Sequence, residues 1–271
     1  MHDLVRVTQG HRARCQDIQT ATAATRRCWS HQFWVSARLK GSLVGVPAEP
    51  TRYAEPVYFI AWLNRFNAAH AWSHNDFYGP WVVRQVRSSG AQKVLDVGCG
   101  TGNLVARLIP WAGTITGLEP HEATARIAAE RFAGNEAVEI RMESFELRDR
   151  GDKFGAITLV AVLHHLPLQE TMKDLASALD PGGRLVIVGC YRESTRADRL
   201  VSFGALLSNP MMGLIKHPRR ARDAPEGMTA PTAPARESLS EIAAEAARFL
   251  PGARIRRRLF WRYSLVYDAS R

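Results

Sequence analysis

A short apolar run followed by a glycine-rich turn constrains the fold of this 271-residue chain more than any other feature. Residues 93–97 have the pattern of a strand, and glycines follow at alternate positions, Gly98, Gly100 and Gly102. Residues 103–109 then have the pattern of a helix. Glycine allows a sharp backbone turn and lets a ligand approach where a Cβ atom would collide. The free amides at the start of the next helix suit an anionic group. The stretch therefore predicts a ligand-binding loop on an α/β sheet.

The spacing of the glycines distinguishes between two kinds of loop. The dinucleotide fingerprint G-x-G-x-x-G requires a third glycine three positions after the second. Counted from Gly98, that position holds Asn103, so the fingerprint is not met. The stretch instead reads D-x-G-x-G-x-G, beginning at Asp96.

Strand and helix patterns alternate downstream of this loop. Strands are expected at 115–118, 137–142, 154–162 and 184–189, and helices at 122–132 and 168–179, with a proline–glycine turn at 180–183. The run at 154–162 is apolar throughout, which is typical of a strand buried on both faces. Such alternation predicts an α/β fold with a doubly wound, mostly parallel sheet and helices on both faces.

Two of these strands end in an acidic residue, Glu119 and Glu143. Glu119 lies about twenty positions beyond the glycine loop, where a carboxylate can accept both hydroxyl protons of a ribose. The alternative is that it only caps the helix that follows. Right-handed crossovers bring the glycine loop and both acids to one carboxyl edge of the sheet. This convergence points to a ligand that contains a nucleoside.

Charge and cysteine content narrow the function classes. The net charge is +10, and the excess lies at the two ends: residues 1–55 carry 8 basic and 4 acidic side chains, and residues 190–271 carry 15 and 8. A basic surface can bind nucleic acid, but no basic groove interleaved with aromatic residues is visible, so we do not expect nucleic acid as a partner. Four cysteines without zinc spacing predict reduced cytoplasmic thiols and no metal site. No apolar run is long enough to span a membrane.

The sequence of the N-terminal part indicates less regular structure than that of the core. Residues 1–50 show no sustained period, so a poorly ordered extension is expected. Residues 56–69 have apolar residues at helical spacing, and a second helix is expected from about Pro80. The linker 70–78 between them either contacts a ligand or forms a turn capped by Ser73 or Asn75.

The sequence of the C-terminal part indicates an insertion, followed by a helix and the last two strands. Residues 191–235 are rich in proline, arginine and methionine, with an apolar piece at 200–207 and a loop at 209–234. An amphipathic helix is expected at 237–250. Two adjacent strands, at 254–260 and 261–269, follow it.

From about Tyr53 onward the chain resembles the class I S-adenosylmethionine-dependent methyltransferases, and most of all the small-molecule branch similar to the ubiquinone and menaquinone biosynthesis enzymes. Four stretches carry the resemblance, in this order: VLDVGCGTG, GLEP, VLHHLP and LDPGGRLVIVG. It implies a Rossmann-like seven-stranded sheet with an antiparallel C-terminal strand, cap helices at 51–90 and a substrate cover at 191–235. Gly155 departs from the family, which often has an aspartate there.

The resemblance also implies a role for particular residues in binding S-adenosyl-L-methionine. The loop residues Asp96, Gly98, Cys99, Gly100 and Gly102 would lie against its methionine portion. Glu119, followed by Pro120, would bind the ribose hydroxyls. Glu143 and Ser144 would sit near the adenine amino group, and Ala161 would line the sulfonium.

Methyl transfer from a sulfonium is a direct displacement, so alignment of the reacting atoms is the main requirement. A general base is needed only if the acceptor must first lose a proton. His164 and His165 lie where that base would be, and histidine has a suitable pKa. The alternative is that both histidines are structural. His74 and Tyr191 are further candidates.

We therefore expect a methyltransferase with a small-molecule acceptor. Two other hypotheses stay open at this point. One is an RNA or protein methyltransferase that docks through its basic ends. The other is a non-catalytic relative that binds the nucleoside.

Overall fold

The computed structural model describes residues 65–67, 69–70, 72–218 and 233–270. Contacts divide the chain into Met1–Pro50 and Thr51–Arg271, and all described residues belong to the second unit. The predicted N-terminal extension at 1–50 and most of the helix expected at 56–69 lie outside these ranges.

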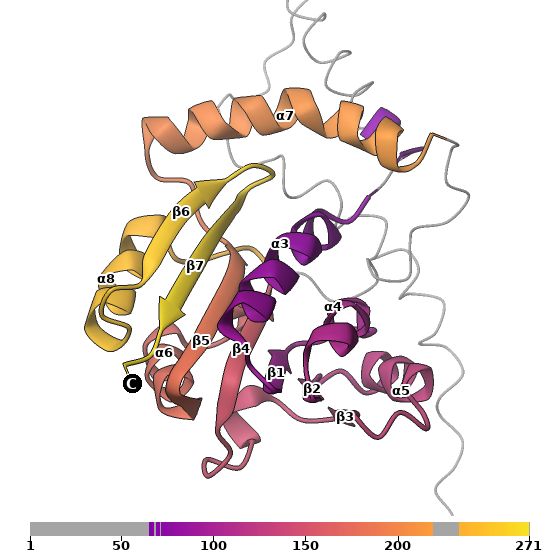
Figure 1. Cartoon of the computed structure of the whole chain (residues 1–271). Coiled ribbons are helices and arrows are strands. Elements are labelled where there is room, and N and C mark those ends of the chain that lie inside the picture. The colour runs from indigo at the N-terminus through magenta and orange to yellow at the C-terminus, as the bar shows by residue number, and fades with distance from the viewer. Residues whose placement is uncertain (1–64, 68, 71, 219–232, 271) are drawn as a thin grey trace, which may run out of the picture. The chain divides into compact units, whose positions relative to one another are not determined.

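A seven-stranded sheet with the order β3-β2-β1-β4-β5-β7-β6 organises this unit (Figure 1). Its strands are β1 (Lys93–Val97), β2 (Thr114–Leu118), β3 (Val138–Arg141), β4 (Phe154–Val160), β5 (Leu179–Cys190), β6 (Arg254–Arg258) and β7 (Arg262–Asp268). Strands β1 to β5 pair in parallel, whereas β7 runs antiparallel to both β5 and β6. The predicted α/β class and the antiparallel C-terminal strand are confirmed.

Helices cover both faces of the sheet. They are α3 (His74–Ser89), α4 (Asn103–Leu108), α5 (Glu122–Arg131), α6 (Leu168–Ala178), α7 (Arg196–Lys216) and α8 (Leu239–Phe249), with short 3-10 turns η2 (Ile109–Trp111), η3 (Phe145–Leu147) and η4 (Leu163–His165). Helices α3, α4 and α5 lie on one face and α6 and α8 on the other (Figure 1). Helix α7 instead runs across the end of the sheet at which β5 stops and β7 begins (Figure 1).

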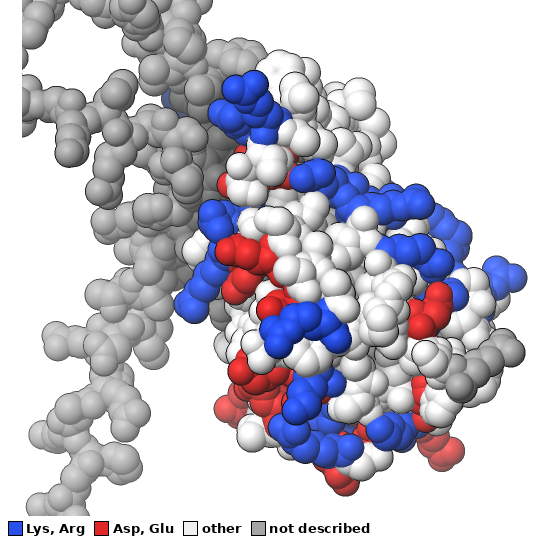
Figure 2. All heavy atoms as spheres, turned by 90° about the vertical axis from the view of Figure 1, so that its left-hand side faces the viewer, with Lys and Arg blue, Asp and Glu red and all other residues white. Residues whose placement is uncertain are grey.

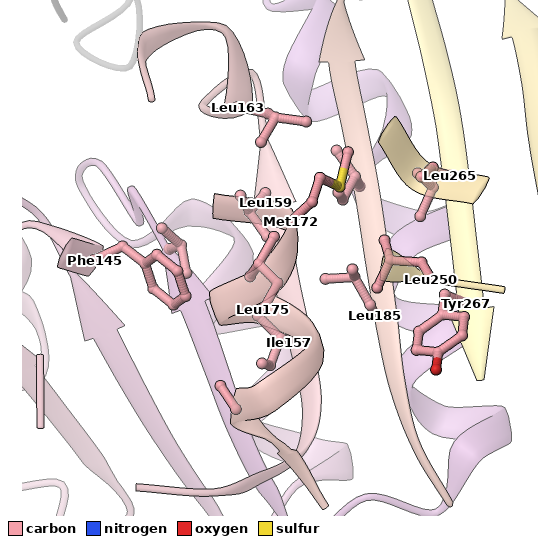
Figure 3. Packing of buried hydrophobic residues seen from close by; sticks show 14 of the residues in the cluster. Phe145, Ile157, Leu159, Leu163, Met172, Leu175, Leu185, Leu250, Leu265 and Tyr267 are labelled. Atoms are coloured by element: carbon pink, nitrogen blue, oxygen red, sulfur yellow. The ribbon is translucent and has the colours of Figure 1, made fainter. Parts of the chain in front are cut away.

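Alternate residues of the central strands pack on opposite faces, as the two-residue period of a strand requires. In β1, Val94 joins the cluster beneath α3 and α4, whereas Leu95 joins the cluster beneath α6 and α8. Figure 3 shows Met172 and Leu175 of α6 lying against strand residues Leu159 and Leu185. Strands β1, β2, β4 and β5 are therefore held between layers, whereas the edge strand β3 packs through Val138 and Ile140 on one face only.

Helix α3 begins earlier than the sequence indicated. The expectation of a start near Pro80 is wrong, because α3 begins at His74 and Pro80 lies inside it. The Ser73 hydroxyl accepts a hydrogen bond from the backbone N–H of Asp76 at 3.1 Å, as an N-cap does. The Ser73 cap that one interpretation of residues 70–78 predicted is therefore present, at the start of a helix rather than in a turn.

The insertion also contains more helix than expected. Helix α7 continues to Lys216, so a loop beginning at Asn209 is wrong for residues 209–216, and Pro210 lies within the helix. Residues 219–232 of the expected loop lie outside the described part. Thr195 and Asp198 form a capping box at the helix start.

The expected proline–glycine turn forms part of β5. The pairing with β4 shifts from Phe154↔Leu179 to Ala156↔Arg184, so residues 180–183 bulge out of the ladder. Gly182 has φ 75°, a conformation in which glycine is favoured. Among the described residues, no helix is both long and apolar enough to cross a bilayer.

Candidate active site

The glycine loop joins β1 to α4, and its three glycines all adopt left-handed backbone. Gly98, Gly100 and Gly102 have φ of 66°, 56° and 82°. For a residue with a side chain this conformation costs roughly 1–2 kcal/mol. The alternating glycines of the sequence are therefore three positions of one turn at which the backbone is left-handed and glycine is favoured.

Two of these glycines are also required by packing, and the third is not. A Cβ atom on Gly98 would lie 2.3 Å from a methyl group of Val162, and one on Gly102 would lie 2.4 Å from the ring of Phe132. A Cβ atom on Gly100 would have nothing within 4 Å. The space over Gly100 is therefore open, and a ligand can approach the backbone there.

Glu119 follows β2 and reaches across to this loop. Its carboxylate accepts one hydrogen bond from the backbone N–H of Gly100 at 3.0 Å and another from the N–H of His121 at 2.9 Å. The backbone of Cys99 also donates to the carbonyl of Leu118 at 2.9 Å. The tips of β1 and β2 are thus joined, and each carboxylate oxygen keeps capacity to accept another donor. Because Glu119 bonds the Gly100 amide as well as the amide of His121 at the start of α5, it does more than cap that helix.

Asp96 lies near the end of β1, almost fully buried at 2% exposure. Burial raises its pKa to about 7, a hydrogen bond from Thr158 opposes the rise, and the nearby charge of Glu119 adds to it. The Thr158 hydroxyl donates to Asp96 at 2.7 Å. A buried carboxylate with so high a pKa has a strong preference for a cationic partner. Thr158 had no special signal in the sequence, because it lies within an apolar run.

Burial raises the pKa of the Cys99 thiol, and the charges of Asp96 and Glu119 add to this rise. This thiol, within the loop, is therefore held in its neutral form.

Glu143 and Ser144 follow β3, which is the neighbour of β2 on the side away from β1. Because β3 pairs in parallel with β2, they lie at the same edge as Glu119. Arg141 is 3.9 Å from the Glu143 carboxylate and Ser144 makes no side-chain capping bond. Both side chains are partly exposed and so can reach a ligand.

The peptide after β4 carries a strained residue. Ala161 has φ 59°, although it is not glycine, and its N–H donates to the carbonyl of Val188 at 2.7 Å. Such strain is found mainly at functional sites. Its neighbour Val162 is the residue that contacts Gly98. The turn after β4 is therefore fitted to the glycine loop, which the sequence motif alone did not reveal.

His164 and His165 form the next turn, η4, with ring centroids 4.1 Å apart. Burial lowers the pKa of His164 to about 4, the neighbouring His165 and Arg262 lower it further, and a backbone hydrogen bond with Ala233 opposes them. Its Nδ1 atom is buried and has no hydrogen-bond partner in the described part of the chain. Burial also lowers the pKa of His165, against the charge of Glu119. Both rings are therefore neutral near pH 7 and able to accept a proton.

The two further candidates, His74 and Tyr191, lie in packed surroundings. The His74 ring stacks on Phe260 at 5.5 Å and its Nε2 atom lies 2.9 Å from the Asn209 side-chain oxygen. Burial lowers the pKa of His74 to about 4. Tyr191 is buried, and burial raises its pKa to about 12. Both are therefore neutral at pH 7.

The structure thus joins the glycine loop to Glu119 through a direct hydrogen bond, holds Asp96 at the end of β1 beside them, and has Glu143, Ala161 and His165 after strands that end at the same edge. This arrangement fits a nucleoside-bearing sulfonium cofactor: an open space over Gly100, a carboxylate for hydroxyl groups, and a buried acid that favours a cation. Among the described residues no cluster of His, Cys, Asp and Glu has the geometry of a metal site.

Known proteins share both the sequence and the fold. Residues 95–185 match the family described as "Methyltransferase domain". An uncharacterized methyltransferase of Mycobacterium tuberculosis is 31% identical over 204 residues, which cover 73% of this chain and 97% of that protein. A ubiquinone biosynthesis O-methyltransferase of Rhizobium leguminosarum is 31% identical over 116 residues, or 42% of this chain and 46% of that protein.

Solved structures agree on the fold. DesVI of Streptomyces venezuelae superposes with a TM-score of 0.52 at 17% identity, covering 83% of this chain and 100% of that one. The plantazolicin methyltransferase BpumL, solved with SAH, superposes with a TM-score of 0.52 at 10% identity, covering 80% and 94%. Given the near-complete match to the mycobacterial relative, this chain belongs to the class I S-adenosyl-L-methionine-dependent methyltransferases.

Proposed function

We propose that this enzyme transfers the methyl group of S-adenosyl-L-methionine to a small molecule at the carboxyl edge of its sheet. The observation that carries the proposal is the contact between Glu119 and the backbone of Gly100, beside an open space. The cofactor supplies an activated methyl group, so the protein has mainly to bind and orient it and its acceptor.

Each predicted cofactor residue has a place in this proposal. Glu119 accepts the ribose hydroxyls, since its two oxygens each have only one backbone donor in the structure. Asp96, with Gly98, Cys99, Gly100 and Gly102 around it, holds the methionine portion, whose ammonium group matches a buried carboxylate. Pro120, Glu143 and Ser144 border the adenine, and Ala161 lines the position of the sulfonium.

We propose His165 and His164 as the groups that accept a proton from the acceptor. His165 is exposed and lies close enough to Glu119 for that charge to affect its pKa, which supports a role beside the cofactor. His164 is more buried, and among the described residues its Nδ1 atom has no hydrogen-bond partner, which leaves this atom free to accept a proton. Both are unprotonated at neutral pH, as a base must be.

A small-molecule acceptor is supported by the similarity to the Rhizobium ubiquinone biosynthesis enzyme. It is also supported by the covering helix α7, which lies over this edge, and we propose that residues 191–235 form the substrate cover of the domain at 51–271 (Figure 1). Reduced thiols such as Cys99 and Cys190, both free, fit a cytoplasmic enzyme.

Transfer of a labelled methyl group tests this function. Purified protein and the labelled cofactor are incubated in three separate reactions, one with a metabolite extract, one with total RNA and one with denatured protein. Label in the metabolite fraction, lost in the His165→Ala variant but not in His121→Ala, supports the proposal. Label in RNA or protein would favour the docking alternative, for which RNA binding should fall steeply with salt. Cofactor binding without label in any fraction would favour a non-catalytic relative.

A further inference from the structure

Arg262, the first residue of β7, lies at the carboxyl end of the central strands. It pairs with Cys190, the last residue of β5. The ends of β4 and β5 are joined there, because the N–H of Ala161, directly after β4, donates to the carbonyl of Val188 at 2.7 Å. Helix α7 runs across this end of the sheet (Figure 1). Arg262 is therefore a half-buried cation at the edge proposed above for methyl transfer.

The hydrogen bonds of the Arg262 guanidinium all go to neutral acceptors. Its Nε and Nη2 atoms donate to the side-chain oxygen of Asn75 at 3.3 and 3.0 Å. Its Nη1 atom donates to the backbone carbonyls of Phe260 and Trp261, each at 3.4 Å. A guanidinium has five N–H groups. These contacts account for four, so one N–H on Nη2 has no acceptor among the described residues.

Arg262 also lacks the ion pair that other arginines of this hairpin form. Arg254 pairs with Asp268 at 3.2 Å, and Arg257 pairs with Asp198 at 2.6 Å. Within the described ranges Arg262 forms no ion pair with a carboxylate, and Asn75 takes the place of one. Arginine is seldom withdrawn from water without a pairing group, because its charge then loses hydration. A bound anion can supply the missing charge. Figure 2 shows that basic side chains with acidic neighbours are common elsewhere on the face beside β6.

The turn that precedes Arg262 is strained. Phe260 and Trp261 both have φ 57°, a left-handed conformation that is rare for bulky residues. Phe260 is 1% exposed and packs with Trp72 and with Ala205 of α7. Such strain persists where the surroundings impose it, most often at functional sites. Because Arg262 follows this turn directly and donates to the carbonyls of both strained residues, its guanidinium is held in place before any ligand binds.

The charge of Arg262 acts on the two histidines nearest this edge. Burial is the main reason that the pKa values of His164 and His74 are lowered to about 4, and the charge of Arg262 lowers both further. For His164 the neighbouring His165 contributes as well. The Nδ1 atom of His164 is also without a hydrogen-bond partner in the described part of the chain. A cation without an anion and a nitrogen without a donor therefore lie within electrostatic reach of each other.

We propose that Arg262 binds an anionic group, a carboxylate or a phosphate, on the methyl acceptor, an inference that rests on the methyl transfer proposed above. The planar guanidinium matches the oxygens of either group, and Asn75 keeps it in position. Arg262 thereby selects anionic acceptors over neutral ones. The bound anion also offsets the positive charge that acts on His164, so this ring becomes a better proton acceptor once the acceptor is in place.

The alternative is that Arg262 only braces the turn. Bracing requires N–H donors for Asn75 and the two carbonyls, but it does not require a charge. Selection of an anion requires the charge, which lysine keeps without the planar fork of donors. The two roles therefore predict different behaviour for Arg262→Lys and a different dependence on the amount of acceptor.

Labelled methyl transfer by the full chain tests the proposal. A metabolite extract is separated on an anion-exchange resin at pH 7, and the retained and unretained fractions serve as acceptors in separate reactions. The variants are Arg262→Gln, which removes the charge, and Arg262→Lys, which keeps it. Arg256→Gln is the control, because Arg256 is an exposed arginine of the same hairpin. Circular dichroism and calorimetry with S-adenosyl-L-methionine check folding and cofactor binding in each variant.

We expect label in the retained fraction. Arg262→Gln should need roughly tenfold more of this fraction for its half-maximal rate, the effect of one lost charge-assisted hydrogen bond, with unchanged maximal rate and cofactor affinity. Arg262→Lys should lie between Arg262→Gln and the wild type, and Arg256→Gln should match the wild type. Phosphatase treatment of the retained fraction separates the two anions, since loss of label identifies a phosphate and persistence of label a carboxylate.

Two results would overturn this proposal and leave the methyl transfer standing. One is label only in the unretained fraction, which the wild type alone reveals even if a variant does not fold. The other is a lower maximal rate in Arg262→Gln that neither more of the fraction nor Arg262→Lys restores, which would assign Arg262 to bracing the turn. Absence of label from both fractions, despite cofactor binding, would instead overturn the proposed methyl transfer and this proposal with it.

Discussion

The carboxylate of Glu119 accepts a hydrogen bond from the backbone N–H of Gly100 at 3.0 Å. This single contact joins the turn after β1 to the end of β2. It also aims a carboxylate, before any ligand binds, at the open space above the loop. The predictions below concern this contact, its neighbours and the packing that holds the surrounding edge in place.

Replacing Glu119 with alanine should weaken cofactor binding at least tenfold, or roughly 1.4 kcal/mol, because a charge-assisted hydrogen bond to the ribose is lost. Titration calorimetry with S-adenosyl-L-methionine measures the change. Glu122→Ala is the control, since Glu122 forms only an exposed ion pair with Arg126 on α5. Equal affinity of Glu119→Ala and wild type would contradict the ribose assignment.

Gly100→Ala and Gly90→Ala form a matched pair. Both glycines have positive φ, 56° and 73°, and neither would have an atom within 4 Å of a new Cβ. Each substitution should therefore lower stability by a similar amount, about 1–2 kcal/mol. Only Gly100→Ala places a methyl group in the proposed cofactor space, so only this variant should lose affinity. Equal affinities in the two folded variants would show that the cofactor does not approach Gly100.

Cofactor affinity should depend on the ionisation of Asp96. Its pKa is raised to about 7 by burial, so below pH 7 the free enzyme carries a proton there that an ammonium partner must displace. Affinity should fall by up to about tenfold per pH unit below 7. Asp96→Asn should bind weakly with a flatter profile, whereas Asp174→Asn should follow the wild type. Calorimetry at pH 6, 7 and 8 gives these profiles, and parallel curves for wild type and Asp96→Asn would rule out this role.

The buried His74 should make the fold less stable in mild acid. Burial lowers its pKa from 6.5 to about 4. Between those values the unfolded chain binds a proton that the folded protein does not, so the free energy of unfolding decreases as pH falls from 6.5 toward 4. Asp96 acts in the opposite direction from pH 7 downward, because its folded pKa is raised, but it does so equally in wild type and variant.

His74→Gln keeps an amide donor for Asn209 and removes the titration. Urea unfolding at pH 7 and pH 5 should therefore show a smaller loss of stability in His74→Gln than in the wild type. The quantity compared is the change in the free energy of unfolding from pH 7 to pH 5. A loss of stability that is the same at both pH values in the variant does not affect this change. Identical losses would show that His74 is protonated equally in the folded and unfolded states.

Arg257 and Arg254, two arginines of β6, should differ in their contribution to stability. Arg257 pairs with Asp198, whose side chain is fully buried, whereas Arg254 pairs with the exposed Asp268. Arg257→Gln should cost about 2 kcal/mol because it leaves a buried carboxylate without its cation, although exposure of Arg257 moderates the loss. Arg254→Gln should change stability by less than about 1 kcal/mol. Thermal unfolding of both variants measures the contrast, and equal midpoints would mean that the α7 anchor lies elsewhere.

The local pattern of the sequence was sufficient to predict the central strands and the glycine loop. A two-residue period in strands and consecutive apolar runs are set by which faces are buried. They located β1 to β4 to within two residues at each end, but for β5 only the part after the predicted turn. The strand-end acids were located for the same reason, since parallel strands place their carboxyl ends at one edge. The start of α3 was misplaced because proline is tolerated in a helix interior when packing outweighs the lost hydrogen bond, as at Pro80.

Tertiary structure decided what no local pattern encodes. The contact of Val162 with Gly98 and the bond from Thr158 to Asp96 join residues more than sixty positions apart in the chain. The packing of α7 is also a tertiary property, because the helix is held by Ala205, Asn209 and Gly213 against the start of α3 and the β6–β7 hairpin, while Phe203 and Leu207 are exposed. The sequence indicated only an apolar piece at 200–207 followed by a loop. The fold determined that a helix continues to Lys216 and which of its faces is buried, because burial depends on partners distant in the chain.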